Sequence, residues 1–154
     1  MTTPVAGIRS ALYEWVRGDA SLTGAEGSSG PLGTADDPAY YPHRAPAHAP
    51  FPHVVAKRSD QPGQRTLTAT RGLRSATFDF EVWGDDTDVV ESVVEALRRR
   101  LESARDHRGE VSIRAVELVG EVDDAEGPED GSEVTWFVTV LTARFTYLVT
   151  SEGA

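Results

Sequence analysis

The stretch that most restricts the fold is VTWFVTVLTARFTYLV, residues 134–149. Its apolar residues alternate over most of its length, which predicts a β-strand with one buried face. The residues of that face are Phe137, Leu141, Ala143, Phe145, Tyr147 and Val149. In the first half the opposite face is apolar too, at Val134, Trp136, Val138 and Val140. Because a sheet with helices on one side presents polar residues to water on the other, we expect this second apolar face to be covered, either by another segment such as the proline-rich loop or by another subunit.

Three other segments predict strands. His53 to Arg58 is the first, and ATFDFEVWG, residues 76–84, shows the clearest alternation, so these two are expected to form a hairpin. Val111 to Val122 is the third. Its apolar phase slips near Ala115 and Val116, which indicates a β-bulge. It is expected to form a second hairpin with residues 134–149.

Two segments predict helices. Residues 4–16 carry one apolar stripe at helical spacing, with Thr3 as a cap, Pro4 in the first turn and Gly18 as a stop. Residues 88–105 carry a second stripe, formed by Val90, Val93, Val94, Leu97, Leu101 and Ala104. Acidic residues precede this second helix and arginines lie toward its end, as the helix dipole favours.

The predicted order is helix, strand, strand, helix, strand, strand. One apolar stripe on each helix and one strongly apolar sheet face predict an α+β fold, a two-layer sandwich with a four-stranded antiparallel sheet and two helices on one face. We expect the strands in the order 3-4-2-1. Residues 1–154 are expected to form a single domain, because a chain of this length suits one core.

A long loop rich in glycine and proline is expected over residues 18–52, and the composition of residues 24–37 predicts flexibility. Proline fixes φ and removes a hydrogen-bond donor, so residues 42–52 predict an extended, polyproline-like segment. We expect that segment to pack across the domain through Tyr40, Tyr41 and Phe51. The alternative is a linker.

Charge and composition exclude several classes of function. The formal net charge of −10 would repel nucleic-acid phosphates, which opposes a DNA-reading function. The chain contains no cysteine, so disulfides and thiolate metal sites are excluded and synthesis in the cytoplasm fits. No apolar run is long enough for a membrane span, and the N-terminus lacks the pattern of a secretory signal.

Motifs for catalysis or ligand binding are missing from the sequence. The acids near residue 86 are interpreted as helix caps rather than a calcium loop, because the EF-hand spacing is absent. No nucleophile-elbow, zinc-protease or phosphate-loop pattern occurs. We interpret the four histidines as exposed loop residues rather than zinc ligands: His43, His48, His53 and His107. The sequence therefore predicts no enzyme, no metal site and no cofactor.

The order of these segments resembles the tail terminator family of long-tailed bacteriophages, also called tail completion proteins. The resemblance lies in the helix IRSALYEWV, the loop AYYPHRAPAHAPFPHVV, the strand FDFEVWG, the helix TDVVESVVEALRRRLE and the last strand VTWFVTVLTARFTYLV. It covers nearly the whole chain in order, while each motif alone is weakly specific. The insert around residues 24–37 and the acidic loop at residues 121–133 depart from the family's pattern.

This resemblance implies a structural virion protein without catalytic activity, located in the tail or neck of the particle and assembled in the host cytoplasm. It implies a homo-oligomeric ring, expected to contain six copies, that caps the tail tube, ends its polymerisation and offers a head–tail joining surface. The implied partners are further copies of the chain, the tail tube protein and the head–tail connector. DNA would pass through the ring without sequence-specific binding, and no membrane is involved. The alternatives are another neck component, such as a connector or adaptor, and a non-viral protein-binding module.

Two sets of residues are candidates for protein contacts. The first is the second apolar face, with Trp83, Trp136, Val138 and Val140. The second is a pair of oppositely charged segments. The basic segment, residues 57–74, contains Arg65 and Arg71. The acidic segment, residues 121–133, contains Glu121, Asp123, Asp124, Glu126, Glu129 and Asp130. We expect the basic segment of one copy to contact the acidic segment of a neighbouring copy or of a tail-tube subunit. The alternative is that both are solvated hairpin tips.

Overall fold

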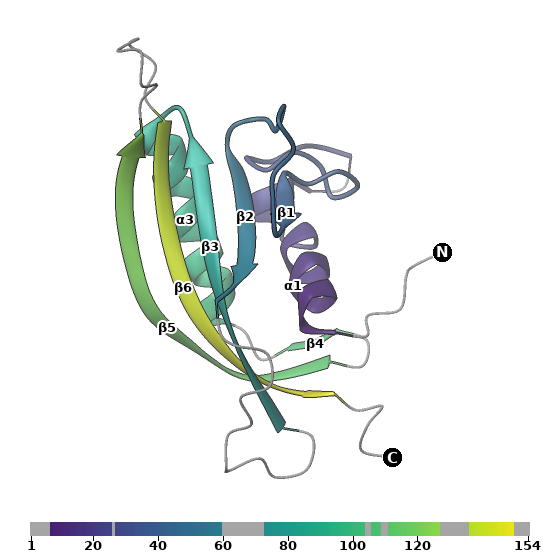
Figure 1. Ribbon diagram of the computed structural model, residues 1–154. Coiled ribbons are helices and arrows are strands. Elements are labelled where there is room, and N and C mark those ends of the chain that lie inside the picture. Colours follow the sequence, from purple (N-terminus) through teal and green to yellow (C-terminus); the bar gives the residue numbers. More distant parts are fainter. Residues whose placement is uncertain are drawn as a thin grey trace.

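The computed structural model describes residues 7–25, 27–59, 73–103, 106–108, 111–126 and 136–149. The elements in chain order are α1 (Ile8–Arg17), α2 (Ala20–Thr23), β1 (Tyr40–Pro42), β2 (His53–Arg58), β3 (Leu73–Gly84), α3 (Thr87–Glu102), β4 (Asp106–Arg108), β5 (Val111–Glu126) and β6 (Trp136–Val149) (Figure 1). Among the described helices, none is long and apolar enough to cross a membrane.

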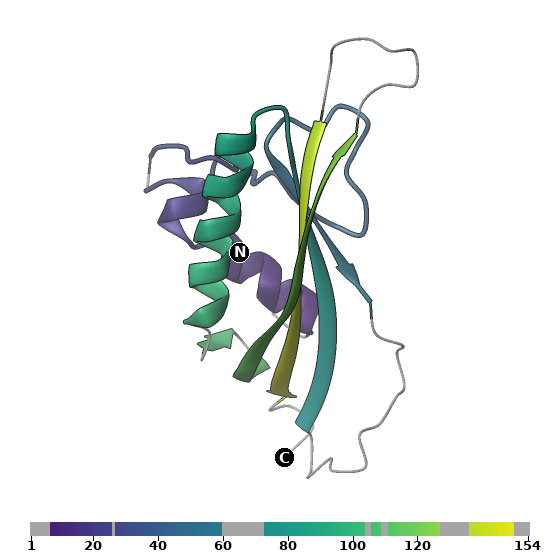
Figure 2. The same ribbon diagram turned by 90° about the vertical axis from the view of Figure 1, so that its left-hand side faces the viewer.

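The strands form one six-stranded sheet in the order β1-β2-β3-β6-β5-β4. All neighbouring pairs are antiparallel except β1 and β2, which run parallel. The helices lie on one side of this sheet (Figure 2). The predicted fold class is therefore wrong, because the sheet is mixed rather than antiparallel, has two more strands than expected and is accompanied by a third helix. Within it, the four long strands are neighbours in the order predicted for them.

The three elements that the sequence patterns did not indicate are short. β1 and β4 lie at the two edges of the sheet and are too short to show an alternating pattern. The edge position also explains Pro42 in β1, because an edge strand tolerates a residue without an N–H donor. The parallel pairing is made by the amide of Val54, which donates to the carbonyl of Ala39 at 2.9 Å, and by the amide of His43, which donates to the carbonyl of Ala56 at 2.9 Å.

The two predicted helices are present. α1 ends at Gly18 as expected and is preceded by Gly7 as its N-cap, while Thr3 and Pro4 lie outside the described residues. α3 is capped by Asp86, whose carboxylate accepts a hydrogen bond from the amide of Asp88 at 2.8 Å. The described members of the predicted apolar stripe of α3 are all buried.

The loop expected at residues 18–52 is largely folded. It contains α2 and β1, and Leu32 within the stretch expected to be flexible is fully buried. The amide of Leu32 donates to the carbonyl of Leu22 at 2.8 Å. Gly30 is needed for this approach, because a Cβ there would lie 2.6 Å from the carbonyl oxygen of Leu22. Leu32 therefore anchors a stretch that was expected to be flexible to the rest of the chain.

The core lies between the helices and the facing side of the sheet. Phe78 and Phe80 of β3 and Phe145 of β6 are buried, and the ring of Phe145 meets those of Phe78 and Phe80 edge-on at 6.0 and 6.2 Å. Leu12 of α1 and Leu97 of α3 belong to the same buried cluster. This cluster consists of the residues that the alternating and helical patterns assigned to the inner faces.

β5 contains two irregularities in its pairing with β6. The register shifts between Ile113 and Ala115, where the sequence predicted a bulge, and again between Leu118 and Gly120, where it did not. Each extra residue reverses the direction in which the following side chains point. After the second shift, Glu121 is opposite Leu141 of the core-facing side, so Glu121 and Asp123 face the helix layer.

Candidate functional site

The sheet face opposite the helices carries the predicted apolar residues as one cluster. In the register of β3 and β6, Trp83 is directly opposite Val138. In the register of β5 and β6, Val140 is opposite Val122, and Trp136 lies four residues before Val140 on β6 and on the same face. These five residues are called the outer patch below. The tertiary structure thus brings together all four residues predicted for this surface and adds Val122.

The chain covers one half of this outer patch itself. His53 is paired with Trp83, and the ring of Phe51 is stacked on the ring of His53 at 5.3 Å. The proline-rich segment that leads to His53 runs on the side of the sheet away from α3 (Figure 2). It is not one extended segment as expected, because the amide of Ala49 donates to the carbonyl of Pro46 at 3.1 Å in a turn. The proline-rich segment therefore accounts for part of the cover.

The other half of the outer patch is open. Val138 is only 6% exposed, whereas Trp136 is 36% and Val122 is 66% exposed. Of the five residues of the outer patch, these two are the exposed ones. Large exposed apolar side chains on one face of a sheet are typical of a contact surface. The outer patch is therefore the first candidate for a protein contact.

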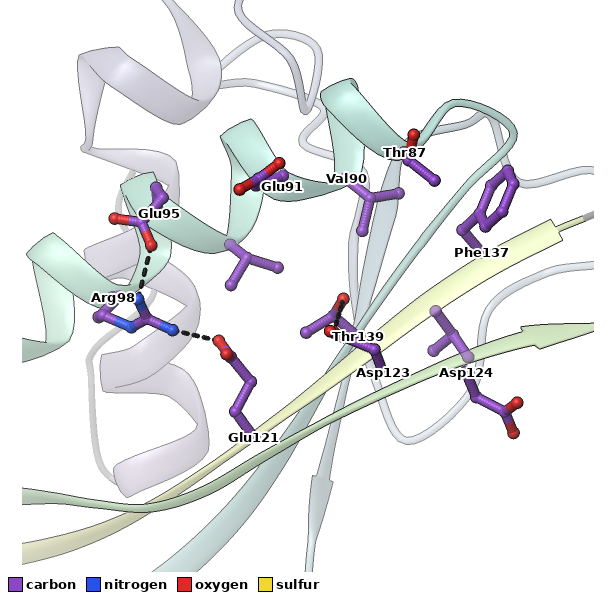
Figure 3. Close-up of a pocket in the computed structure, with 12 residues that line it drawn as sticks. Thr87, Val90, Glu91, Glu95, Arg98, Glu121, Asp123, Asp124, Phe137 and Thr139 are labelled. Atoms are coloured by element: carbon purple, nitrogen blue, oxygen red, sulfur yellow. Dashed lines mark hydrogen bonds and ion pairs between the residues drawn. The ribbon is translucent and has the colours of Figure 1, made fainter.

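The charged candidates are separated by the structure. Arg65, Arg71, Glu129 and Asp130 lie outside the described residues. Glu126 is the last residue of β5 and pairs through its backbone with Trp136. Asp124 is opposite Val138, on the outer side of the sheet. Glu121 and Asp123 instead face α3 (Figure 3).

A groove of about 420 Å³ lies between α3 and the paired ends of β5 and β6 (Figure 3). Val90 and Val94 of α3 and Phe137 of β6 supply its apolar lining. Acidic residues of both elements surround this lining: Glu91, Glu95, Glu121 and Asp123. The groove was not predicted from the sequence. The spacing of Glu91, Glu95 and Arg98 on one helix face was the available signal.

One end of the groove is closed by ion pairs. The guanidinium of Arg98 binds Glu95 of its own helix at 2.5 Å and also binds Glu121 of β5. Farther along the groove, the hydroxyl of Thr139 donates to the carboxylate of Asp123 at 2.8 Å. Glu121 thus has a partner in its own chain, as does Lys57, whose ammonium is 3.0 Å from Glu81. The predicted contact between copies would have to compete with these ion pairs within the chain.

Among the described residues, no three or more histidine or acidic side chains form a group that could hold a metal ion. His53 is not the exposed loop residue expected from the sequence, since it begins β2 and is 8% exposed. His43 and His48 are exposed, and the side chain of His107 is not described.

Burial lowers the pKa of His53 below its usual value of 6.5, although the carbonyl of Pro50 and the charge of Glu81 act in the opposite direction. The folded state therefore binds a proton less readily than the unfolded state, and this group reduces stability as the pH falls below about 6.5. We expect His53→Phe, which keeps a ring against Phe51, to lose less stability than the wild type between pH 7.5 and pH 5.5. Urea denaturation of both proteins at both pH values measures this, and equal losses would contradict it.

The comparisons with known proteins concern the fold. No protein-family model and no curated protein matches the sequence. Among solved structures, the chain is similar to a chain in the virion of a native gene transfer agent particle. The two share 15% sequence identity with a TM-score of 0.60, over 92% of this chain and 94% of the other. The two chains therefore share their fold over nearly their whole lengths.

Proposed function

We propose that this chain is a structural protein of a phage-like virion. The observation that carries the proposal is its fold, which it shares over nearly its full length with a chain of a gene transfer agent virion. The order of sequence segments that resembles the tail terminator family supports the same assignment independently of that likeness. The role is mechanical, and we assign it no catalysed reaction and no cofactor.

Within the virion, we assign to the chain the role of tail terminator. Copies of the chain, expected to be six, would form a ring on the end of the tail tube, stop its growth and present a surface to the head–tail connector. A ring closes through contacts between two different surfaces of each copy. The outer patch and the groove lie on opposite sides of the sheet and differ in chemistry, so each can meet a different surface of a neighbouring copy. The acidic character of the chain also suits a ring through which DNA passes without binding.

The ring and its effect on the tube test the proposal together. We expect sedimentation velocity and electron microscopy of the purified chain to show a closed six-fold ring. Added to polymerising tail tube protein, the chain should shorten the length distribution of the tubes at about one ring per tube end. A ring that binds the head-side connector and leaves tube length unchanged would instead indicate a connector or adaptor. A monomer without effect on the tubes would contradict a virion ring.

A further inference from the structure

We propose that the groove between α3 and the ends of β5 and β6 binds the connection between β2 and β3 of a neighbouring copy, residues 59–72, with an arginine as the anchoring side chain. This inference rests on the proposed ring and names the contact that would close it. It assigns to the basic segment a different receptor from the acidic hairpin tip that the sequence suggested.

The chemistry of the groove suits a long basic side chain. Its apolar lining includes Val90 and Phe137, and the carboxylates of Glu91 and Asp123 stand at its edge (Figure 3). An arginine places an aliphatic stem against apolar surface and a planar cation against carboxylates. Arg98 already binds two carboxylates in this way at one end of the groove. Among the described residues, no basic side chain forms an ion pair with Glu91 or Asp123. These two carboxylates can therefore bind a second cation.

The connection from residue 59 to residue 72 carries the complementary chemistry. It contains Arg65 and Arg71 and one acid, Asp60. Leu67 lies between the two arginines and adds an apolar side chain for the lining of the groove. Opposite charge on the two surfaces favours their encounter and fixes their relative position more than it increases affinity.

For Arg71, the topology requires this contact to be made between copies. Leu73, the first residue of β3, pairs with Leu148 at one end of the sheet, whereas the groove residue Thr139 lies near the other end of β6. These two positions on β6 are separated by about 30 Å at roughly 3.3 Å per residue. Arg71 is two residues from Leu73, and two extended residues span only about 7 Å. Arg71 therefore cannot bind the groove of its own chain, and a contact between opposite ends of two copies is of the kind that closes a ring.

Single introduced cysteines test the contact directly, because the chain contains none of its own. Glu91→Cys and Arg71→Cys are prepared separately, mixed under assembly conditions and treated with a short bis-maleimide. We expect a cross-linked dimer containing one chain of each kind, and little product from either variant alone. The matched control is Glu102→Cys, an exposed acid at the end of the same helix and outside the groove. A mixture that cross-links no better through Glu91→Cys than through Glu102→Cys overturns the inference.

Charge exchange supplies a second readout. Glu91→Arg and Arg71→Glu should each slow assembly about tenfold at low salt, and the two together should restore much of the rate, because the pair is rebuilt with opposite sign. Added salt should slow the wild type, since charges are screened beyond roughly 8 Å at physiological ionic strength. Glu102→Arg should assemble at the wild-type rate. Single variants that assemble normally and do not respond to salt contradict the contact.

The outcomes separate this inference from the proposed ring. A closed ring that forms without specific cross-links and without charge dependence leaves the ring standing and removes the groove as its contact. Specific cross-links between copies that sediment as open chains rather than closed rings support the contact and contradict the terminator ring. To measure the contact where no ring forms, a synthetic peptide of residues 57–74 is titrated into the wild type and into Glu91→Arg. Weaker binding to the variant supports the groove as the receptor, and equal binding opposes it.

Discussion

Replacing Phe145 with alanine is expected to lower the free energy of unfolding by about 3–5 kcal/mol. Phe145 is fully buried, and its ring contacts the rings of Phe78 and Phe80 edge-on, with interplanar angles of 74° to each. Removing the ring loses its transfer free energy and leaves a cavity between β6 and β3 that rigid neighbouring rings cannot fill. Urea denaturation followed by tryptophan fluorescence measures the change.

Thr146→Ala is the matched control for this substitution. Thr146 is the next residue of β6, points to the opposite side of the sheet and is half-buried. Its replacement should change the free energy of unfolding by no more than about 0.5 kcal/mol, because it leaves the core untouched. If Phe145→Ala and Thr146→Ala destabilise the protein equally, the aromatic cluster is not the centre of the core.

Replacing Trp136 with glutamate is expected to weaken ring assembly by about 30-fold or more, while the monomer remains folded. Buried tryptophans at the centre of an interface often contribute 2 kcal/mol or more to binding, which corresponds to that factor. Trp136 is 36% exposed in the single chain and lies on the same face of β6 as Val138, so part of its surface can become buried on contact. A glutamate there would place an additional charge in an apolar contact. Sedimentation velocity over a range of protein concentrations measures the effect.

The chain offers a close control for the substitution of Trp136. Val89 of α3 is 37% exposed, almost the same fraction as Trp136, and lies on the helix side of the sheet away from the outer patch. Val89→Glu should therefore leave assembly unchanged. Val138→Glu should unfold the monomer instead, because Val138 is 6% exposed and opposite Trp83. A ring that assembles normally with Trp136→Glu would show that the exposed tryptophan is no interface residue, and an unfolded variant would place it in the core.

Features whose cause is local could be predicted from the sequence. The inner face of β3 alternates because successive strand residues point to opposite sides, and the stripe of α3 recurs because the helix repeats every 3.6 residues. Asp86 caps α3 because its carboxylate meets an amide two residues away. The first bulge of β5 was visible as a slip of the apolar phase at Ala115 and Val116. In each case the residues that interact are close in the sequence.

The outer patch could be predicted only in part. The apolar residues of β6 were evident, and Trp83 was assigned to the same face from the alternation of its own strand. The sequence did not decide whether another segment of the chain or another subunit covers these residues. Phe51 of the proline-rich segment is stacked on His53, which is paired with Trp83 at one half of the patch, while Trp136 and Val122 at the other half are exposed. This division depends on where a segment distant in sequence is placed.

The mixed sheet and the groove required the tertiary structure. β1 is a strand because its three residues pair with β2 across the folded loop of residues 43–52, and such pairing leaves no periodic pattern in so short a segment. The groove depends on the second bulge of β5, since one extra residue at Leu118 and Gly120 turns Glu121 and Asp123 toward α3. Sequence periodicity states which residues share a face, but the pairing register decides which layer that face meets. From the sequence, Glu121 and Asp123 could be part of a solvated hairpin tip. In the folded chain they form the edge of a groove, because the pairing register places them against a helix.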